Sequence, residues 1–314
     1  MANYPKRHAA FIYLCGKTGS SDVVKSHQVH FAVCFFIFLE VFVIIVVMAK
    51  LGFIKFKTIV INLFLIAALI GVGFFGYMLI KERKLFVNEW FIGNALKGVD
   101  ISSYQGDVNM KSLSNQGVRF AYIKATEGSS HVDEKFEANW KNVEQTDIKS
   151  GAYHFFSFKS SGEDQAENYI STVGDLKGRL IPAVDIEMHE GAEGEAPEKD
   201  SLIRQLKIFM AVLEDEYKTK PMIYAQKDFY DKYLKEDFSG YPVWARNVYF
   251  PVYIEFGGDW TLWQYKDRGE LEGYSGGEKY IDLDILNPNK NLDDLIVKDS
   301  RSHDDSEKDA ENQN

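Results

Sequence analysis

Two carboxylates close a short apolar stretch in the middle of the chain. The stretch is Leu180-Ile-Pro-Ala-Val-Asp185-Ile-Glu187-Met188, and its β-branched residues predict a buried strand over 180–187. Alternate residues of a strand share a face, so Asp185 and Glu187 are expected to project together at its C-terminal end. Two carboxylates held close in a partly dry cleft repel each other, which favours a state with one protonated and one ionised. The pair therefore predicts an acid and a base in one place.

Acidic and aromatic residues recur at the ends of other predicted strands. The acids lie in Gly98-Val-Asp100-Ile-Ser and in Tyr280-Ile-Asp282-Leu-Asp284. Acidic groups ringed by aromatic side chains suit a carbohydrate, because sugar faces stack on flat rings while the hydroxyls bond to carboxylates. We therefore predict a carbohydrate site in which the substrate-binding side chains, all at comparable strand positions, are Tyr153, Phe155, Tyr224, Trp244, Trp263, Gln264 and Tyr265.

The scaffold for these residues is an alternation of short apolar runs with polar helical stretches. The predicted strands are Val99–Ser102, Val118–Ala125, Gly151–Phe156, Leu180–Glu187, Pro221–Gln226, Pro242–Arg246, Trp260–Tyr265 and Tyr280–Ile285. The predicted helices are Asp133–Asp147, Glu163–Val173 behind a Ser161-Gly-Glu-Asp164 capping pattern, Glu198–Tyr217 and Lys227–Lys235. This alternation predicts an α/β fold, an irregular (β/α) TIM-like barrel of parallel strands over residues 98–297, with active groups at the C-terminal strand ends. A doubly wound open sheet is the alternative.

A membrane region is predicted over residues 31–80, upstream of the barrel. The run Thr58–Ile80 carries no charge and reaches roughly 34 Å at about 1.5 Å per residue, enough to cross a bilayer. A second candidate span, residues 31–49, is interrupted by Glu40, which is costly in lipid. One or two transmembrane helices are therefore expected. The flanking parts are interpreted as a polar leader (1–30), a tether (81–97) and a disordered acidic tail (298–314).

Two arrangements of this region are open. In the first, both runs form a hairpin with Lys50, Lys55 and Lys57 in a cytoplasmic turn. In the second, translation starts at Met48, and the basic segment followed by the clean run is an uncleaved signal anchor. Both arrangements anchor the barrel to the membrane on the extracytoplasmic side, whereas the flank Lys81-Glu-Arg-Lys84 weakly favours the opposite orientation.

Charge argues against nucleic acid as a partner. The chain has a net charge of −10, and residues 1–97 contribute +7, which leaves −17 for residues 98–314. A part that acidic is repelled by phosphate backbones. Both cysteines, Cys15 and Cys34, lie in the N-terminal part, so no disulfide is expected in the barrel.

No cofactor or metal is predicted. The stretch Gly71-Val-Gly73-Phe-Phe-Gly76 matches a dinucleotide motif in form, but it lies inside a hydrophobic run, where small residues for helix packing explain it better. His154 has no second His or Cys at metal-like spacing, since His131 and His189 lie in predicted loops. Lys124 and Glu127 are interpreted as a structural ion pair or a cleft wall.

From Gly98 to about Val297 the chain resembles glycoside hydrolase family 25, the muramidases often called Chalaropsis-type lysozymes. The resemblance covers none of the predicted membrane region. The matching stretches occur in the same order as in the family: Gly98-Val-Asp-Ile-Ser, Phe120-Ala-Tyr-Ile-Lys-Ala-Thr-Glu-Gly, Gly151-Ala-Tyr-His-Phe-Phe, Pro182-Ala-Val-Asp-Ile-Glu, Ile223-Tyr, Val243-Trp-Ala and Leu262-Trp-Gln-Tyr.

The resemblance implies hydrolysis of the β-1,4 bond between N-acetylmuramic acid and N-acetylglucosamine in peptidoglycan. It implies that Glu187 is the general acid, and that Asp185 either stabilises positive charge at the sugar carbon or orients the acetamido group as an internal nucleophile. Asp100 and Asp282 match the other two acidic site residues of the family, and Tyr224 is expected to face the reacting sugar. Strand parity allows Asp284 to face inward as well, but the family pattern favours Asp282.

Three other functions compete with this one. A non-catalytic, membrane-tethered peptidoglycan-binding module on a decayed barrel predicts a lost acid, yet all four acids are present. A chitinase-type hydrolase shares the paired acids but has a longer acidic series before the Glu. A purely structural wall tether has no use for an acidic cluster. The stretches after Ile223 and Ala245 depart from the family patterns, which leaves the subsite contacts open.

Overall fold

The computed structural model describes residues 56–81, 87–188 and 198–298. The chain divides into two compact units, Met1–Leu79 and Ile80–Asn314. In the first unit, helix α3 (Phe56–Lys81) contains a continuous apolar segment, Lys57–Ile80, with a mean hydropathy of 2.5 and no buried residues. By length and composition this helix is a candidate membrane span. The predicted leader, the candidate span at 31–49 and the predicted tail after Lys298 lie outside the described residues.

The second unit is built on a closed barrel of eight strands, as predicted. The strands of the sheet are β1 (Lys97–Ile101), β2 (Val118–Glu127), β3 (His131–Val132), β4 (Lys149–Phe155), β5 (Ala183–Asp185), β6 (Met222–Gln226), β7 (Val243–Arg246), β8 (Leu262–Gly269) and β9 (Ile281–Leu286). Their order is β1-β9-β8-β7-β6-β5-β4-β2-β3, and β1 also pairs with β2 to close the barrel. The short β3 is an antiparallel addition to β2.

The last strand corrects the expectation of an all-parallel barrel. Strand β9 runs antiparallel to both β8 and β1, whereas the other barrel strands are parallel to one another. A parallel return needs a crossover, usually through a helix, and the link between β8 and β9 contains none. The chain therefore turns back directly, and the barrel is irregular at this point.

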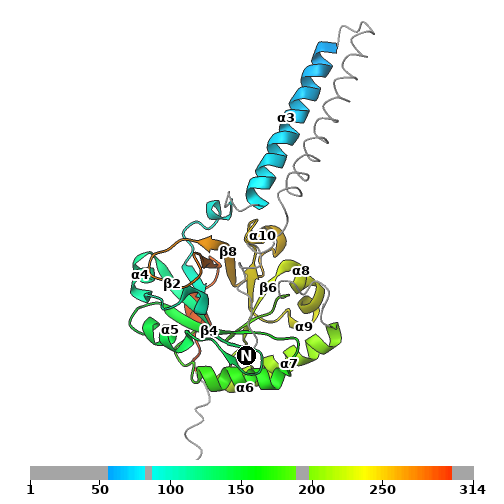
Figure 1. Cartoon of the computed structure of the whole chain (residues 1–314). Helices are drawn as coiled ribbons and strands as arrows, with labels where there is room; N and C mark the ends of the chain where they lie inside the picture. The colour runs from blue at the N-terminus through cyan, green and yellow to red at the C-terminus, as the bar shows by residue number, and fades with distance from the viewer. Residues whose placement is uncertain (1–55, 82–86, 189–197, 299–314) are drawn as a thin grey trace, which may run out of the picture. The chain divides into compact units, whose positions relative to one another are not determined.

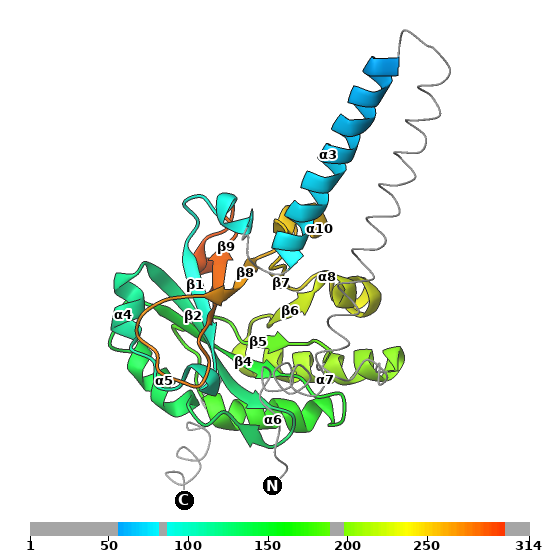
Figure 2. The ribbon, with the colours of Figure 1, turned by 45° about the horizontal axis from the view of Figure 1, so that its top comes forward.

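Helices surround the outside of the strands (Figures 1 and 2). They are α4 (Met110–Asn115), α5 (Phe136–Val143), α6 (Gly162–Val173), α7 (Lys199–Tyr217), α8 (Lys227–Phe229), the π-helical turn η3 (Tyr230–Leu234), α9 (Lys235–Phe238) and α10 (Val252–Glu255), with 3-10 turns η1 (Val87–Trp90), η2 (Ser103–Gln105) and η4 (Leu292–Leu295). The predicted cap of α6 is confirmed, because Ser161 Oγ accepts a hydrogen bond from the N–H of Asp164 over 3.1 Å. Helices α4 and α10 were not predicted.

Strand parity separates the core into two layers. Outward-facing residues such as Val99, Ile123 and Val184 are fully buried beneath the helices. On the inner side, the ring of Trp244 lies 5.0 Å from the rings of both Tyr122 and Tyr224. These aromatic side chains fill the barrel, and the polar residues nearer the C-terminal strand ends lie above them.

Candidate active site

The paired acids lie where strand β5 ends. Asp185 is in register with Phe155 of β4 and Tyr224 of β6, so all three project to the same side of the sheet. The backbone N–H of Ile186 donates to the carbonyl of Tyr224, which continues the pairing by one residue. Glu187 then returns to the inner side, and its Oε2 accepts a hydrogen bond of 3.3 Å from Gln226 Nε2.

Three of the predicted acidic residues lie close to the phenol group of Tyr224. Tyr224 is 6% exposed, and burial is the largest cause that raises its pKa well above the usual value. The negative charges of Glu187, Asp185 and Asp100 raise it further, while Arg246 lowers it. Charges act at this strength only over short distances in a site of low polarity. The structure therefore brings three of the four predicted acids around one phenol.

A chain of hydrogen bonds connects three strands across the barrel. The hydroxyl of Tyr224 donates to Gln264 Oε1 over 3.0 Å, and Gln264 Nε2 donates to Asp100 Oδ2 over 2.8 Å. Gln264 is only 2% exposed, so its amide is fixed with the oxygen toward the phenol and the nitrogen toward the carboxylate. Tyr224 and Asp100 are thereby held in one arrangement.

Both acids of strand β9 face inward, at different depths. Asp282 is directly opposite Asp100 in the β1–β9 register, near the cleft. Asp284 lies deeper and is fully buried, and its Oδ1 accepts a hydrogen bond from Trp244 Nε1 over 2.7 Å. Burial is the main cause that raises the pKa of Asp284 to about 8, and the charge of Asp282 adds to it. Asp284 is therefore a neutral carboxyl at neutral pH, beneath the acids of the cleft.

Arg246 is a site residue that the sequence analysis missed. It lies on the inner side of β7, two residues after Trp244, and its side chain is 21% exposed. Burial lowers the pKa of Arg246, but Tyr224, Glu187 and Asp282 around it raise the pKa by more, so the guanidinium stays charged. The cation thus feels acids of β5 and β9, and its Nη2 lies 3.4 Å from Asp267 Oδ2 of β8. The only signal for it was its inward position on a predicted strand.

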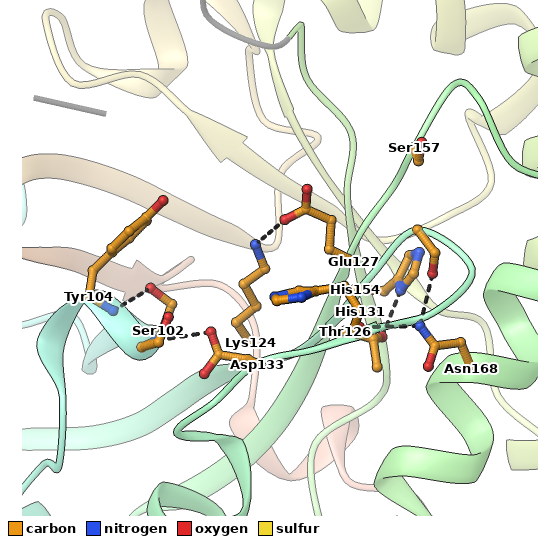
Figure 3. Close-up of polar contacts among 12 residues, drawn as sticks. Ser102, Tyr104, Lys124, Thr126, Glu127, His131, Asp133, His154, Ser157 and Asn168 are labelled. Atoms are coloured by element: carbon orange, nitrogen blue, oxygen red, sulfur yellow. Dashed lines mark hydrogen bonds and ion pairs between the residues drawn. The ribbon is translucent and has the colours of Figure 1, made fainter. Parts of the chain in front are cut away.

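One wall of the cleft carries the predicted ion pair. Lys124 Nζ lies 2.6 Å from Glu127 Oε2 (Figure 3). The same nitrogen lies 4.9 Å from the centroid of the Phe155 ring. Glu127 and Phe155 are partners in the β2–β4 register, so both face inward. The interpretation of Lys124 and Glu127 as an ion pair is confirmed.

His154 points away from the cleft. Its Nδ1 lies 2.7 Å from Thr126 Oγ1 (Figure 3). Its ring stacks on Phe209 of α7 at 4.9 Å, and Nε2 lies 3.0 Å from Gln165 Oε1. Gln165 Oε1 also accepts the N–H of Ser157, so Nε2 of His154 is the donor and Nδ1 accepts from Thr126. Burial lowers the pKa of His154 to about 4. This residue is a core histidine.

The predicted aromatic residues divide by strand parity. Tyr153 lies on the inner side, with its ring edge-on to Trp244 at 6.4 Å. Trp263 and Tyr265 lie on the other side of β8 from Gln264, and Trp263 Nε1 donates to the carbonyl of Asn247 over 2.8 Å. The rings of Trp263 and Tyr265 pack against each other with their centroids 5.9 Å apart, and both side chains are buried, so the substrate-binding role predicted for these two residues does not fit this placement.

No metal site is present in the described parts of the chain, where no three His, Cys, Asp or Glu side chains are grouped to hold an ion. The three glycines of the Gly71–Gly76 motif lie inside helix α3.

Comparison with known proteins agrees with this geometry. Residues 99–274 match the family described as Glycosyl hydrolases family 25. A solved family 25 glycosyl hydrolase from Bacillus anthracis is 41% identical with a TM-score of 0.59, covering 63% of this chain and 91% of that one. Lysozyme M1 of Streptomyces globisporus is 31% identical over 194 residues, which are 58% of this chain and 66% of the relative. The uncharacterized protein YegX of Escherichia coli K12 is 29% identical over 221 residues, 69% of this chain and 77% of YegX. The chain therefore belongs to glycosyl hydrolase family 25 and is a glycoside hydrolase.

Proposed function

We propose that this hydrolase is a muramidase that cleaves the β-1,4 bond between N-acetylmuramic acid and N-acetylglucosamine in peptidoglycan, with Glu187 as its general acid. The observation that carries the proposal is the placement of Asp185 and Glu187 on successive inward positions at the end of β5, against Tyr224. Lysozymes and muramidases among the relatives support the choice of substrate.

Glu187 acts first in the proposed reaction. Its proton passes to the glycosidic oxygen as the bond from that oxygen to the sugar carbon breaks, and the carboxylate later accepts a proton from the attacking water. Glu187 is suited to this work because it lies at the rim of the site, where Gln226 Nε2 reaches its Oε2 and fixes that oxygen.

Asp185 acts on the sugar that loses its leaving group. Its carboxylate, 9% exposed, either stabilises the positive charge that develops at the sugar carbon or holds the substrate's acetamido group as an internal nucleophile. Asp100 and Asp282, opposite each other in the β1–β9 register, bind the substrate beside it. Gln264 holds Tyr224 and Asp100 in position, and Tyr153 and Phe155 supply aromatic surface. Trp244, which is 2% exposed, fills the barrel beneath them, so the substrate-binding role predicted for it does not fit its placement.

The membrane anchor is part of the same proposal. Helix α3 is long and apolar enough to span a bilayer, and peptidoglycan lies outside the cytoplasm. We therefore place the barrel, residues 98–297, on the extracytoplasmic side, joined to the anchor by the tether at 81–97 and followed by the acidic tail at 298–314. A second span over residues 31–49 is the hairpin form of this proposal.

The proposal is tested with the full-length chain in detergent micelles and purified peptidoglycan. Wild type is compared with Glu187→Gln and with Glu137→Gln, a matched change at an exposed position on α5. We expect wild type and Glu137→Gln to release soluble glycan fragments, and Glu187→Gln to release almost none. Equal release by all three proteins contradicts the role of Glu187. No release by any of them, with glycan binding retained, supports the non-catalytic binding module.

A further inference from the structure

A cluster of exposed apolar side chains lies on the barrel unit, outside the cleft. It consists of Trp90, Phe91, Phe250, Tyr253 and Ile254, which we name the apolar patch. Its members come from η1 and the residue after it, and from the segment around α10. They are between 36% and 69% exposed. Scattered exposed apolar residues are ordinary, but a contiguous group of large ones marks an interaction surface.

The two segments of the apolar patch are joined to each other. The rings of Phe91 and Tyr253 meet edge to face with their centroids 5.9 Å apart. Beneath them, the buried side chain of Asn88 donates hydrogen bonds to the backbone carbonyls of Asn247 and Tyr265, over 2.9 and 3.0 Å. These bonds fasten η1 to the residue after β7 and to the middle of β8, so the patch is one surface built from two parts of the chain.

The segment that carries the rest of the patch is also held in place. Asn247 Oδ1 accepts the backbone N–H of Phe250 over 3.1 Å, and Asn247 Nδ2 donates to Glu255 Oε2 over 2.7 Å. Phe250 and Ile254 therefore sit on a turn that is bonded at both ends. The apolar side chains are presented to solvent by a fixed backbone, which is the condition for a binding surface that is already formed.

We infer that the apolar patch docks onto the lipid–water interface of the membrane that α3 spans, an inference that rests on the proposed anchor. The chain from Lys81 to Trp90 is at most about 30 Å long even when fully extended, at about 3.3–3.6 Å per residue. The tether thus keeps the patch within reach of one bilayer surface at a high effective concentration.

The chemistry of the patch fits lipid better than sugar. Trp and Tyr favour the membrane interface because their rings are apolar and their edges polar, and Phe and Ile insert further. A sugar needs polar groups beside the ring for its hydroxyls, and Phe91, Phe250 and Ile254 offer none. Because residues 98–314 carry −17, an anionic surface repels them, and docking must come from apolar insertion.

Docking has a consequence for the cleft. The segment that carries Phe250, Tyr253 and Ile254 begins at Asn247, the residue directly after Arg246 of the cleft. A docked patch therefore holds the mouth of the barrel beside the bilayer, and the enzyme cuts glycan that lies close to the membrane.

The inference is tested on the full-length chain with Cys15→Ser and Cys34→Ser, reconstituted into vesicles of phosphatidylethanolamine and phosphatidylglycerol. A nitroxide spin label is attached at Ile254→Cys or, as the control, at Ile208→Cys, an apolar and exposed position on α7. Electron paramagnetic resonance measures how often the label collides with oxygen, which is enriched in lipid, and with a water-soluble nickel complex. Flotation of the vesicles shows separately whether the protein is anchored in them.

We expect the protein to float with the vesicles, which shows that it is anchored. In these vesicles the ratio of oxygen collisions to nickel collisions should be several-fold higher for the label at position 254 than for the label at position 208. Equal ratios in floating vesicles overturn docking and leave the anchor standing. Loss of the chain from the floating vesicles overturns the anchor and the docking together. A label at 254 that becomes shielded from nickel only when peptidoglycan fragments are added identifies the patch as a glycan surface and overturns the assignment to lipid.

Discussion

The indole Nε1 of Trp244 donates a hydrogen bond to Oδ1 of Asp284 over 2.7 Å in the interior of the barrel. The same indole ring contacts Tyr122 and Tyr224, so the carboxyl group is enclosed by aromatic side chains below the cleft. A charge at this depth is costly, which is why the pKa of Asp284 is raised to about 8. The carboxyl group beneath Asp100 and Asp282 is therefore neutral, and this limits the electrostatic repulsion between carboxylates in the cleft.

Asp284→Asn is expected to remove the loss of stability that the buried carboxyl causes in wild type as pH rises from about 4 to about 8. The carboxyl of wild type binds a proton in the folded state up to about pH 8, but in the unfolded state only up to about pH 4. Between these values the folded state holds more protons, so the free energy of unfolding falls as pH rises, by up to several kcal/mol. The amide oxygen of Asn keeps the bond from Trp244 and carries no charge.

The measurement is the apparent Tm of both proteins from pH 4 to pH 9. The variant should melt higher than wild type at pH 8, and the difference should shrink toward pH 4. Parallel curves over the whole range would show that Asp284 is ionised in the folded protein.

His154 is expected to act in the opposite direction. Its pKa is lowered to about 4 by burial, whereas an unfolded histidine binds a proton near pH 6.5. Between these values the unfolded state holds more protons, so stability is lost as pH falls from about 6.5 to 4. Titration of the imidazole signals by NMR, with His154→Gln to assign the resonance, checks this. A His154 signal that titrates near pH 6.5 would disagree with the buried, neutral ring.

Gln264→Leu is expected to lower catalysis more than a change at Trp263, the residue before it. The substitution removes the shared hydrogen-bond partner of Tyr224 and Asp100, which should cost about 1–3 kcal/mol of stability. The loss of alignment should lower kcat by roughly ten-fold or more. Trp263→Phe is the control, because it removes one bond to Asn247 on the outer side of β8. We expect kcat of this variant to be unchanged, and a larger loss in Trp263→Phe than in Gln264→Leu would reverse the assignment of the two faces.

Arg246→Met tests the cation of the cleft. The charges of Glu187 and Asp282 raise the pKa of Arg246, so removing the guanidinium leaves the repulsion between these acids uncompensated. We expect kcat to fall by roughly ten-fold or more, with a shifted pH profile of kcat/KM. Arg204→Met, at an exposed position on α7, should keep both. An unchanged pH profile for Arg246→Met would mean that Arg246 has only a structural role.

Much of the barrel was predictable, because its signals are local. The eight short apolar runs and the cap at Ser161 are patterns of residues that are adjacent in the sequence. Each of these runs corresponds to a barrel strand. Helices α4 and α10 are too short to show a helical period. The direction of β9 depends on how the chain returns from β8, which no local pattern encodes.

The part of the site that follows from the alternation of side chains along a strand was predictable. Asp185 and Glu187 are two residues apart, and so are Asp282 and Asp284, so their common orientation follows from the strand. The stretch Trp263-Gln264-Tyr265 was assigned as a whole, although alternate residues point to opposite sides. Arg246 was missed because a lone arginine has no spacing pattern, and its role arises from the charges that folding brings around it.

The most direct test of the central claim is the identity of the new reducing ends in a peptidoglycan digest by the full-length chain. The digest is reduced with borohydride and the sugars are identified by mass spectrometry, for wild type and for Glu187→Gln. We predict reduced N-acetylmuramic acid from wild type and only traces from the variant. Reduced N-acetylglucosamine as the new end, or equal amounts of reduced N-acetylmuramic acid from both proteins, would contradict a muramidase with Glu187 as its acid.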